Sequence, residues 1–234
     1  MKVTTEKKKP FIDMTAMSDV TVLLLTFFML TSTFLQKEPT TVITPASVSE
    51  EKVPEQNLIT LLVTKDSQIF MSIAGDRDST YSSDKMREEV LKNVVAEYNK
   101  KQPNDKKIQL TNADIATFGS THMFGLPLAQ LSAWCKLPAE QRDALLDPVK
   151  NPKAGIPIDM GKDVENRNEF QQWMLALYNT SNPNLAKAVK NGKGIAIKAD
   201  AATPYSVVQV VMDNLQTLKM NKFTLMTALK TEED

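Results

Sequence analysis

The chain has 234 residues, with 28 basic and 28 acidic side chains and a single cysteine, Cys135. A neutral chain with only 6% aromatic residues, and with no Lys/Arg stripe interleaved with aromatic residues, gives no reason to expect nucleic-acid binding. One cysteine excludes an intrachain disulfide and a zinc site built from several cysteines. The remaining composition, 42% hydrophobic and 24% charged, is typical of globular proteins.

The N-terminal region differs sharply from the rest. Four of the first nine residues are lysines, whereas residues 10–36 carry only two charges, Asp13 and Asp19. The apolar stretch of about 24 residues that ends at Leu35 would form a helix on the order of 36 Å long, sufficient to cross a hydrocarbon core of roughly 30 Å. Its Thr and Ser hydroxyls can bond to helix carbonyls. We therefore predict a tail at 1–10 and a transmembrane helix at 11–35.

The lysines before this span place the N-terminus in the cytoplasm and most of the chain on the other side of the membrane. The alternative is a cleaved signal peptide, which also combines a basic start with an apolar stretch. The length of the stretch, its two aspartates and the lack of a good small-x-small site after it favour an uncleaved span.

Asp19 is the most informative residue of the span. A carboxylate in a membrane helix costs at least about 2.5–3.5 kcal/mol on insertion scales, and moving one charge through 100 mV is worth about 2.3 kcal/mol. Because these magnitudes are comparable, a membrane potential can bias the protonation and position of such a group. We predict that Asp19 transfers protons, with the Thr15 hydroxyl one turn earlier as its support. The alternative is an interfacial Asp19 that extends to water.

The remainder of the chain is soluble in character. Residues 36–57 contain three prolines and little periodicity, which predicts an extended linker. A domain at 58–234 begins with two predicted strands joined by a turn, Leu58–Thr64 and Ile69–Ile73, followed by a helix at Ser83–Lys100 that Ser83 could cap. Residues 103–190 are predicted to be a helical insertion, with helices at 123–134, 138–146 and 167–178 and a loop at 150–164.

Two segments resemble the ExbD/TolR family. The stretch Ile12–Asp19 and the apolar run after it resemble the membrane segment of that family, with Thr15, Asp19, Phe28 and Met29 on matching positions and Ala16 where proline is usual. Near the C-terminus, Gly194–Asp200 is similar to the family's strand that ends in a basic residue, Ala and Asp. A helix at 205–218 and a strand at 223–228 follow in the family's order.

The resemblance implies a fold class and a role. The fold would be α+β, with one N-terminal transmembrane helix and a small periplasmic sheet-and-helix domain, located in the bacterial inner membrane. The chain would form a dimer within a pentamer of an ExbB/TolQ-like multi-span subunit, and Asp19 would carry protons as the coupling ion. Work would pass to a TonB-like protein or, in the TolR branch, to an envelope-integrity system. In relatives, residues after the span pair with a partner as an added strand, and Thr41, Val42 and Ile43 could do so here.

Other chemistry finds little support in the sequence. His122 and Cys135 are the only residues of their kinds, and no Asn or Asp pattern accompanies them as in a nucleophilic site. We therefore expect no enzymatic activity, metal or organic cofactor. The alternative to the motor is a signal-anchored periplasmic scaffold with no proton role. The insertion could serve as a partner-binding surface or only for packing.

Overall fold

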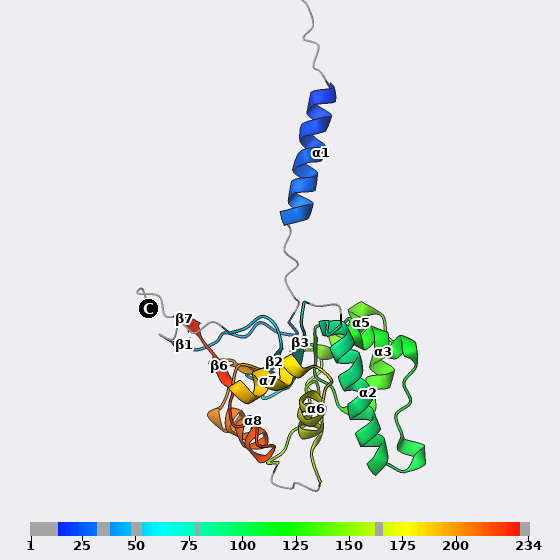
Figure 1. The fold of residues 1–234 in the computed structure, drawn as a ribbon, viewed down its shortest axis with the longest axis vertical. Helices are drawn as coiled ribbons and strands as arrows, with labels where there is room; N and C mark the ends of the chain where they lie inside the picture. Colours follow the sequence, from blue (N-terminus) through cyan, green and yellow to red (C-terminus); the bar gives the residue numbers. More distant parts are fainter. Residues whose placement is uncertain (1–13, 32–37, 48–52, 78–79, 162–165, 230–234) are drawn as a thin grey trace, which may run out of the picture. The chain divides into compact units, whose positions relative to one another are not determined.

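The computed structural model describes residues 14–31, 38–47, 53–77, 80–161 and 166–229 (Figure 1). The chain divides into two compact units, Met1–Gln36 and Lys37–Asp234. The described part of the first unit is one helix, α1 (Met14–Thr31). Among the described residues, no helix is both long enough and apolar enough to cross a membrane. The tail at 1–10 and both ends of the predicted span lie outside the described residues.

The second unit is built on a five-stranded mixed sheet with the order β4-β3-β2-β5-β6. Strands β2 (Leu58–Val63) and β3 (Ile69–Ala74) form the predicted antiparallel hairpin. Its turn contains Ser67 at φ 65°, where the Ser67 N–H donates to the Thr64 carbonyl at 3.0 Å. On the other side, β2 pairs in parallel with β5 (Ile195–Ala199), which pairs in parallel with β6 (Thr224–Met226). The sheet therefore unites the first hairpin with the C-terminal segment.

Seven α-helices are described in this unit. Helix α2 (Ser83–Lys101) buries Met86, Val90 and Val94 at four-residue steps, as its periodicity predicts. A capping box between Thr111 and Asp114 begins α3 (Asn112–Gly119). The others are α4 (Leu128–Cys135), α5 (Ala139–Leu146), α6 (Glu169–Tyr178), α7 (Pro183–Asn191) and α8 (Tyr205–Thr217), with a 3₁₀ turn at Asn104–Lys106.

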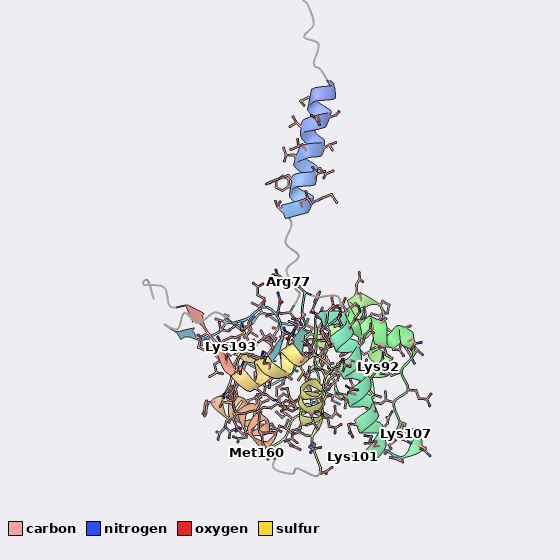
Figure 2. The ribbon with its side chains drawn as sticks, viewed as in Figure 1. Arg77, Lys92, Lys101, Lys107, Met160 and Lys193 are labelled. Atoms are coloured by element: carbon pink, nitrogen blue, oxygen red, sulfur yellow. The ribbon has the colours of Figure 1, made fainter. Side chains whose placement is uncertain are left out.

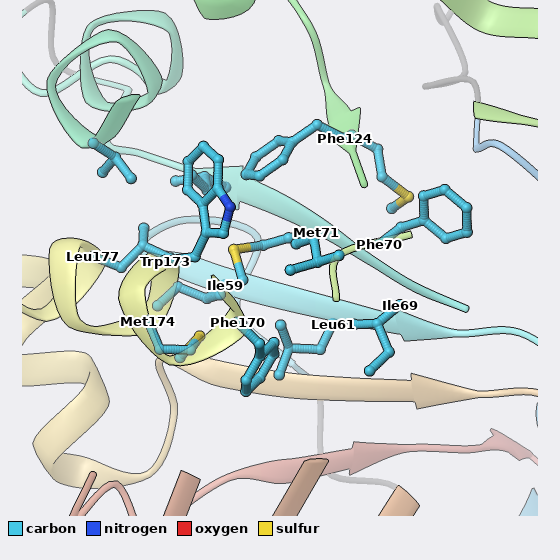
Figure 3. Close-up of a cluster of buried hydrophobic side chains, with 14 of the residues drawn as sticks. Ile59, Leu61, Ile69, Phe70, Met71, Phe124, Phe170, Trp173, Met174 and Leu177 are labelled. Carbon is cyan, nitrogen blue, oxygen red and sulfur yellow. The ribbon is translucent and has the colours of Figure 1, made fainter. Parts of the chain in front are cut away.

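The core centres on α6, which belongs to the predicted insertion. Figure 3 shows Phe170, Trp173 and Met174 of α6 beside Ile59 and Met71 of the sheet. The Trp173 ring is fully buried, with its centroid 4.7 Å from that of Phe124 and 5.8 Å from that of Phe118. Burying such large side chains stabilises a fold strongly, so the insertion is part of the domain's core.

The α+β class and most predicted elements are confirmed, but two details are wrong and one helix was not predicted. The predicted helix at 123–134 starts only at Leu128, because Met123–Phe124 form strand β4 and pair with β3. Ser83 does not cap α2; its hydroxyl accepts from the Gly75 N–H at 2.9 Å. Helix α7 was not predicted, although the Asn182 cap, Pro183 and a left-handed Gly192 mark its ends.

Candidate functional site

The first unit presents an apolar helix whose described side chains, residues 17–31, are all exposed within this chain. Side chains project from both sides of α1 (Figure 2), and Leu23, Phe28 and Leu30 are each more than 60% exposed. Three hydroxyls are satisfied internally, because Thr21, Thr26 and Thr31 donate to carbonyls three or four residues earlier at 2.7–2.9 Å. A helix that is apolar on every side is typical of one surrounded by protein or lipid.

Asp19 is the one charged residue of α1. It is exposed and lies five residues from the first helical residue, which is about 7.5 Å along the axis. Leu23 and Thr26 share its face at helical spacing. Thr15 lies in the same helix one turn earlier, but its side chain is outside the described part. The predicted support of Asp19 by Thr15 therefore stays a prediction.

The second unit begins with a segment, residues 38–47, that we call the tether. Both Glu38 carboxylate oxygens accept from Lys198 Nζ, at 2.7 and 2.8 Å. The Ile43 N–H donates to Asp200 Oδ2 at 3.1 Å, and the Ala201 N–H donates to the Ile43 carbonyl at 2.7 Å. The tether is therefore bonded to the domain on both sides of Val42, which is itself buried.

The tether is held by Lys198, which lies in β5, and by Asp200, which directly follows β5. We call these two residues the tether clamp. Residues two apart in an extended strand point to the same side, and the Asp200 N–H still bonds to the Val63 carbonyl beside β5. Asp200 Oδ1 also accepts from the Ala202 N–H at 2.9 Å, which fixes the carboxylate. The basic-Ala-Asp pattern at the end of this strand thus has a structural role here: it fastens the segment that follows α1.

The tether ends in a second, two-stranded sheet. Strand β1 (Ala46–Ser47) pairs in parallel with β7 (Ala228–Leu229), which follows β6 near the C-terminus. The tether therefore contacts segments more than 150 residues away in sequence.

The tether bears directly on the predicted partner strand at Thr41, Val42 and Ile43. Both backbone groups of Ile43 bond within the same chain, and the Val42 side chain is buried in the domain. An added strand at this position would have to replace those bonds. Pairing of these residues with a partner stays a prediction.

No group of three or more His, Cys, Asp or Glu side chains that could bind a metal occurs in the described part of the chain. Cys135 is buried, and burial raises the pKa of its thiol to about 11. His122 is exposed on the turn between α3 and β4. The two residues do not form a nucleophile–base pair in the observed hydrogen bonds.

These features define a class: an α+β domain whose first segment, the tether, is bonded to its sheet, and a separate apolar helix earlier in the chain that carries one carboxylate. The profile of the biopolymer transport protein ExbD/TolR family matches residues 5–121, half of the chain. The chain belongs to the ExbD/TolR family of biopolymer transport proteins. The match extends from α1 through the tether to the end of α3. Comparisons with individual curated proteins and with solved structures gave no match.

Proposed function

We propose that this protein is a subunit of an inner-membrane motor driven by the proton-motive force, with Asp19 as the proton-carrying residue. The observation that carries the proposal is the position of one carboxylate in a helix that has no other charged residue and is mostly apolar. Membership of a family of biopolymer transport proteins supports it. In this proposal the span is residues 11–35, the N-terminus is cytoplasmic and the domain is periplasmic.

The proposed coupling uses the two protonation states of Asp19. As a carboxylate, Asp19 favours a wet or cationic environment, and as a neutral acid it tolerates an apolar one. A potential of 100 mV supplies about 2.3 kcal/mol per charge moved, which is enough to bias an exchange between two such environments. Because this chain contributes one helix, the proton path requires other chains. We propose an ExbB/TolQ-like multi-span subunit that surrounds a dimer of this helix.

The proposed output of the motor passes through the tether. The tether follows α1 in the chain and is bonded to the clamp through Glu38 and Ile43. In this proposal, a movement of α1 that displaces residue 38 would weaken the bonds between the tether and the clamp. Release of Ile43 would free its backbone groups and the Val42 side chain for a partner strand. We propose a TonB-like protein as that partner, which would energise outer-membrane transport.

The experiment replaces Asp19 in cells that depend on this chain for energised outer-membrane uptake. Asp19→Asn keeps the shape of the side chain but cannot release a proton, so we expect normal membrane levels and loss of energised uptake. Asp13→Asn is the matched control, because it removes the other acid near the span, and we expect it to retain most uptake. Full uptake with Asp19→Asn would overturn the proton role and favour the signal-anchored scaffold.

A second output is a TolR-like role in envelope integrity. The family description includes both ExbD and TolR, and the proton chemistry proposed for Asp19 would be the same. The two outputs are separated by the phenotype of Asp19→Asn cells. Loss of uptake with an intact envelope supports the TonB-linked role, whereas leakage of periplasmic proteins with normal uptake supports the TolR-like role.

A further inference from the structure

A cavity of about 450 Å³ lies in the second unit, between the tether and the insertion. Its walls are the turn between α3 and β4, the end of α4, helix α5 and residues 38–39 of the tether. A volume of this size is typical of small-molecule sites. Most of the wall belongs to residues beyond the family match, which ends at residue 121.

One wall of the cavity carries an oriented guanidinium group, that of Arg142. Its central carbon lies 5.6 Å from the centroid of the Trp134 ring, which is almost fully buried. The Trp134 indole N–H donates to the Arg142 carbonyl at 3.1 Å, which fixes the two residues together. A guanidinium that stacks on an aromatic ring has a defined orientation and retains its capacity to bind an anion.

The hydrogen-bonding capacity of Arg142 is not fully used. Its contact from Nη1 to Thr121 Oγ1 is long, at 3.5 Å, and its buried Nε–H has no acceptor among the described residues. A guanidinium has five N–H donors arranged to match a carboxylate or phosphate. The Nε–H itself is buried, but the Arg142 side chain as a whole is only partly buried and lines the cavity, so its accessible N–H groups can donate to an anionic oxygen group there.

Negatively charged carboxylates also line this cavity. Glu38, Glu140, Asp143 and Asp147 line it, against only two permanent cations, Arg142 and Lys150. Glu140 is exposed in the first turn of α5, whereas Asp147 already lies 3.6 Å from Lys150. A purely anionic ligand would meet these carboxylates, and a purely cationic ligand would leave Arg142 unmatched. A ligand with both charges satisfies both sides.

We propose that this cavity binds a compact zwitterion. Its anionic oxygen group would lie at Arg142 beside the Trp134 ring, and its ammonium group would lie toward Glu140, with the Glu38–Lys198 pair at the edge of the site. An amino acid, a peptide with both termini free and the phosphoethanolamine headgroup of a lipid share this chemistry. The proposal goes beyond the motor function and does not depend on the proton role of Asp19.

The site also contains a link to the tether. Glu38 lines the cavity and at the same time accepts from the clamp residue Lys198. A ligand that contacts Glu38 changes the environment of that ion pair. By thermodynamic linkage, ligand binding and tether attachment then influence each other equally.

The test uses the full chain in detergent and its intrinsic fluorescence. Trp134 lines the cavity, whereas Trp173, the other tryptophan, is fully buried in the core. The probes are glycylglycine and free phosphoethanolamine, with acetate and ethylammonium as single-charge controls. We expect a saturable fluorescence change with at least one zwitterion, and at least about tenfold weaker binding of either single-charge control. The tighter zwitterion identifies the peptide or headgroup source.

Three variants complete the test. Arg142→Gln is expected to weaken zwitterion binding by about tenfold or more, since a charge-assisted contact is lost. Glu140→Gln alters only an exposed side chain and is expected to weaken binding of the ammonium group without affecting the fold. Arg77→Gln is the matched control, because Arg77 lies on the surface (Figure 2) in an exposed pair with Glu55 outside the cavity. No saturable change with either zwitterion would overturn the proposal. Equal binding of acetate, or unchanged binding in Glu140→Gln, would do so too.

Discussion

Breaking the tether clamp should release the tether while the domain stays folded. The Lys198–Glu38 pair is partly buried, with side-chain exposures of 21% and 34%. Exposed pairs contribute about 0.2–1 kcal/mol and removing one partner of a fully buried pair costs roughly 3–5 kcal/mol, so we expect Lys198→Met to weaken tether attachment by about 1–2 kcal/mol. The expected loss lies well below the cost for a fully buried pair because the Glu38 carboxylate, which is one-third exposed, remains able to contact water in the variant.

The expected readout is faster amide hydrogen exchange at the tether contacts. The Ala201 N–H donates to the Ile43 carbonyl at 2.7 Å, so its protection reports local opening. A loss of about 1–2 kcal/mol corresponds to roughly 5–30-fold faster exchange, with unchanged protection in β2 and β3. The assay is hydrogen exchange of the full chain followed by mass spectrometry.

The matched control for the clamp is Lys100→Met. Lys100 pairs with Glu97 at 3.0 Å in α2, but both side chains are more than half exposed, so this variant should not change exchange at the tether. Unchanged exchange at the Ala201 N–H in Lys198→Met would show that the Lys198–Glu38 pair does not hold the tether. An equal loss of protection across the whole sheet would also contradict the prediction, because the pair would then stabilise the domain and not the tether alone.

Three further predictions concern the domain. Arg87→Met should lower the free energy of unfolding by about 2–5 kcal/mol, because the buried Arg87 side chain donates to the backbone carbonyls of Ile73 and Gly119. Urea denaturation measures this loss, and an unchanged urea midpoint would contradict the prediction. Because the Cys135 thiol pKa is about 11, maleimide labelling at pH 8 should be at least about 100-fold slower in the native chain than in urea; equal rates would contradict this. Burial raises the pKa of Glu169 above its ordinary 4.5, so its contribution to stability is present at low pH and is lost as pH rises through the raised pKa. Glu169→Gln, which still accepts from the Leu128 N–H, should flatten that dependence and be no less stable at pH 7; a lower melting temperature there would contradict this.

Much of the fold could be predicted because its elements carry strong local patterns. The hairpin, α2, α5 and α6 follow from apolar periodicity and from turn and first-turn residues. Strand β5 and helix α8 were predicted from the resemblance to the ExbD/TolR family. Strand β4 could not be predicted in the same way, because two residues carry no period and its strand conformation depends on pairing with β3. Helix α7 had readable capping signals at Asn182, Pro183 and Gly192 that were missed.

The candidate sites likewise differ in whether local sequence or long-range packing forms them. Asp19 stands out locally, as one charge in an apolar run. The tether clamp does not, because Glu38 and Lys198 are 160 residues apart and only the parallel pairing of β5 with β2 places Lys198 and Asp200 beside the tether. The pattern at Gly194–Asp200 indicated a strand end but not what it holds. The contact of Arg142 with Trp134 likewise depends on how α4 and α5 pack together.

The most direct test of the central claim is proton flux in liposomes. The full chain would be reconstituted with the proposed ExbB/TolQ-like multi-span subunit. Proton entry would be measured with an internal pH dye while a potassium gradient sets a potential of about 100 mV, worth about 2.3 kcal/mol per charge. We expect proton flux that requires both subunits, persists in Asp13→Asn and disappears in Asp19→Asn although the complex still assembles. Undiminished flux through an assembled Asp19→Asn complex would contradict this prediction.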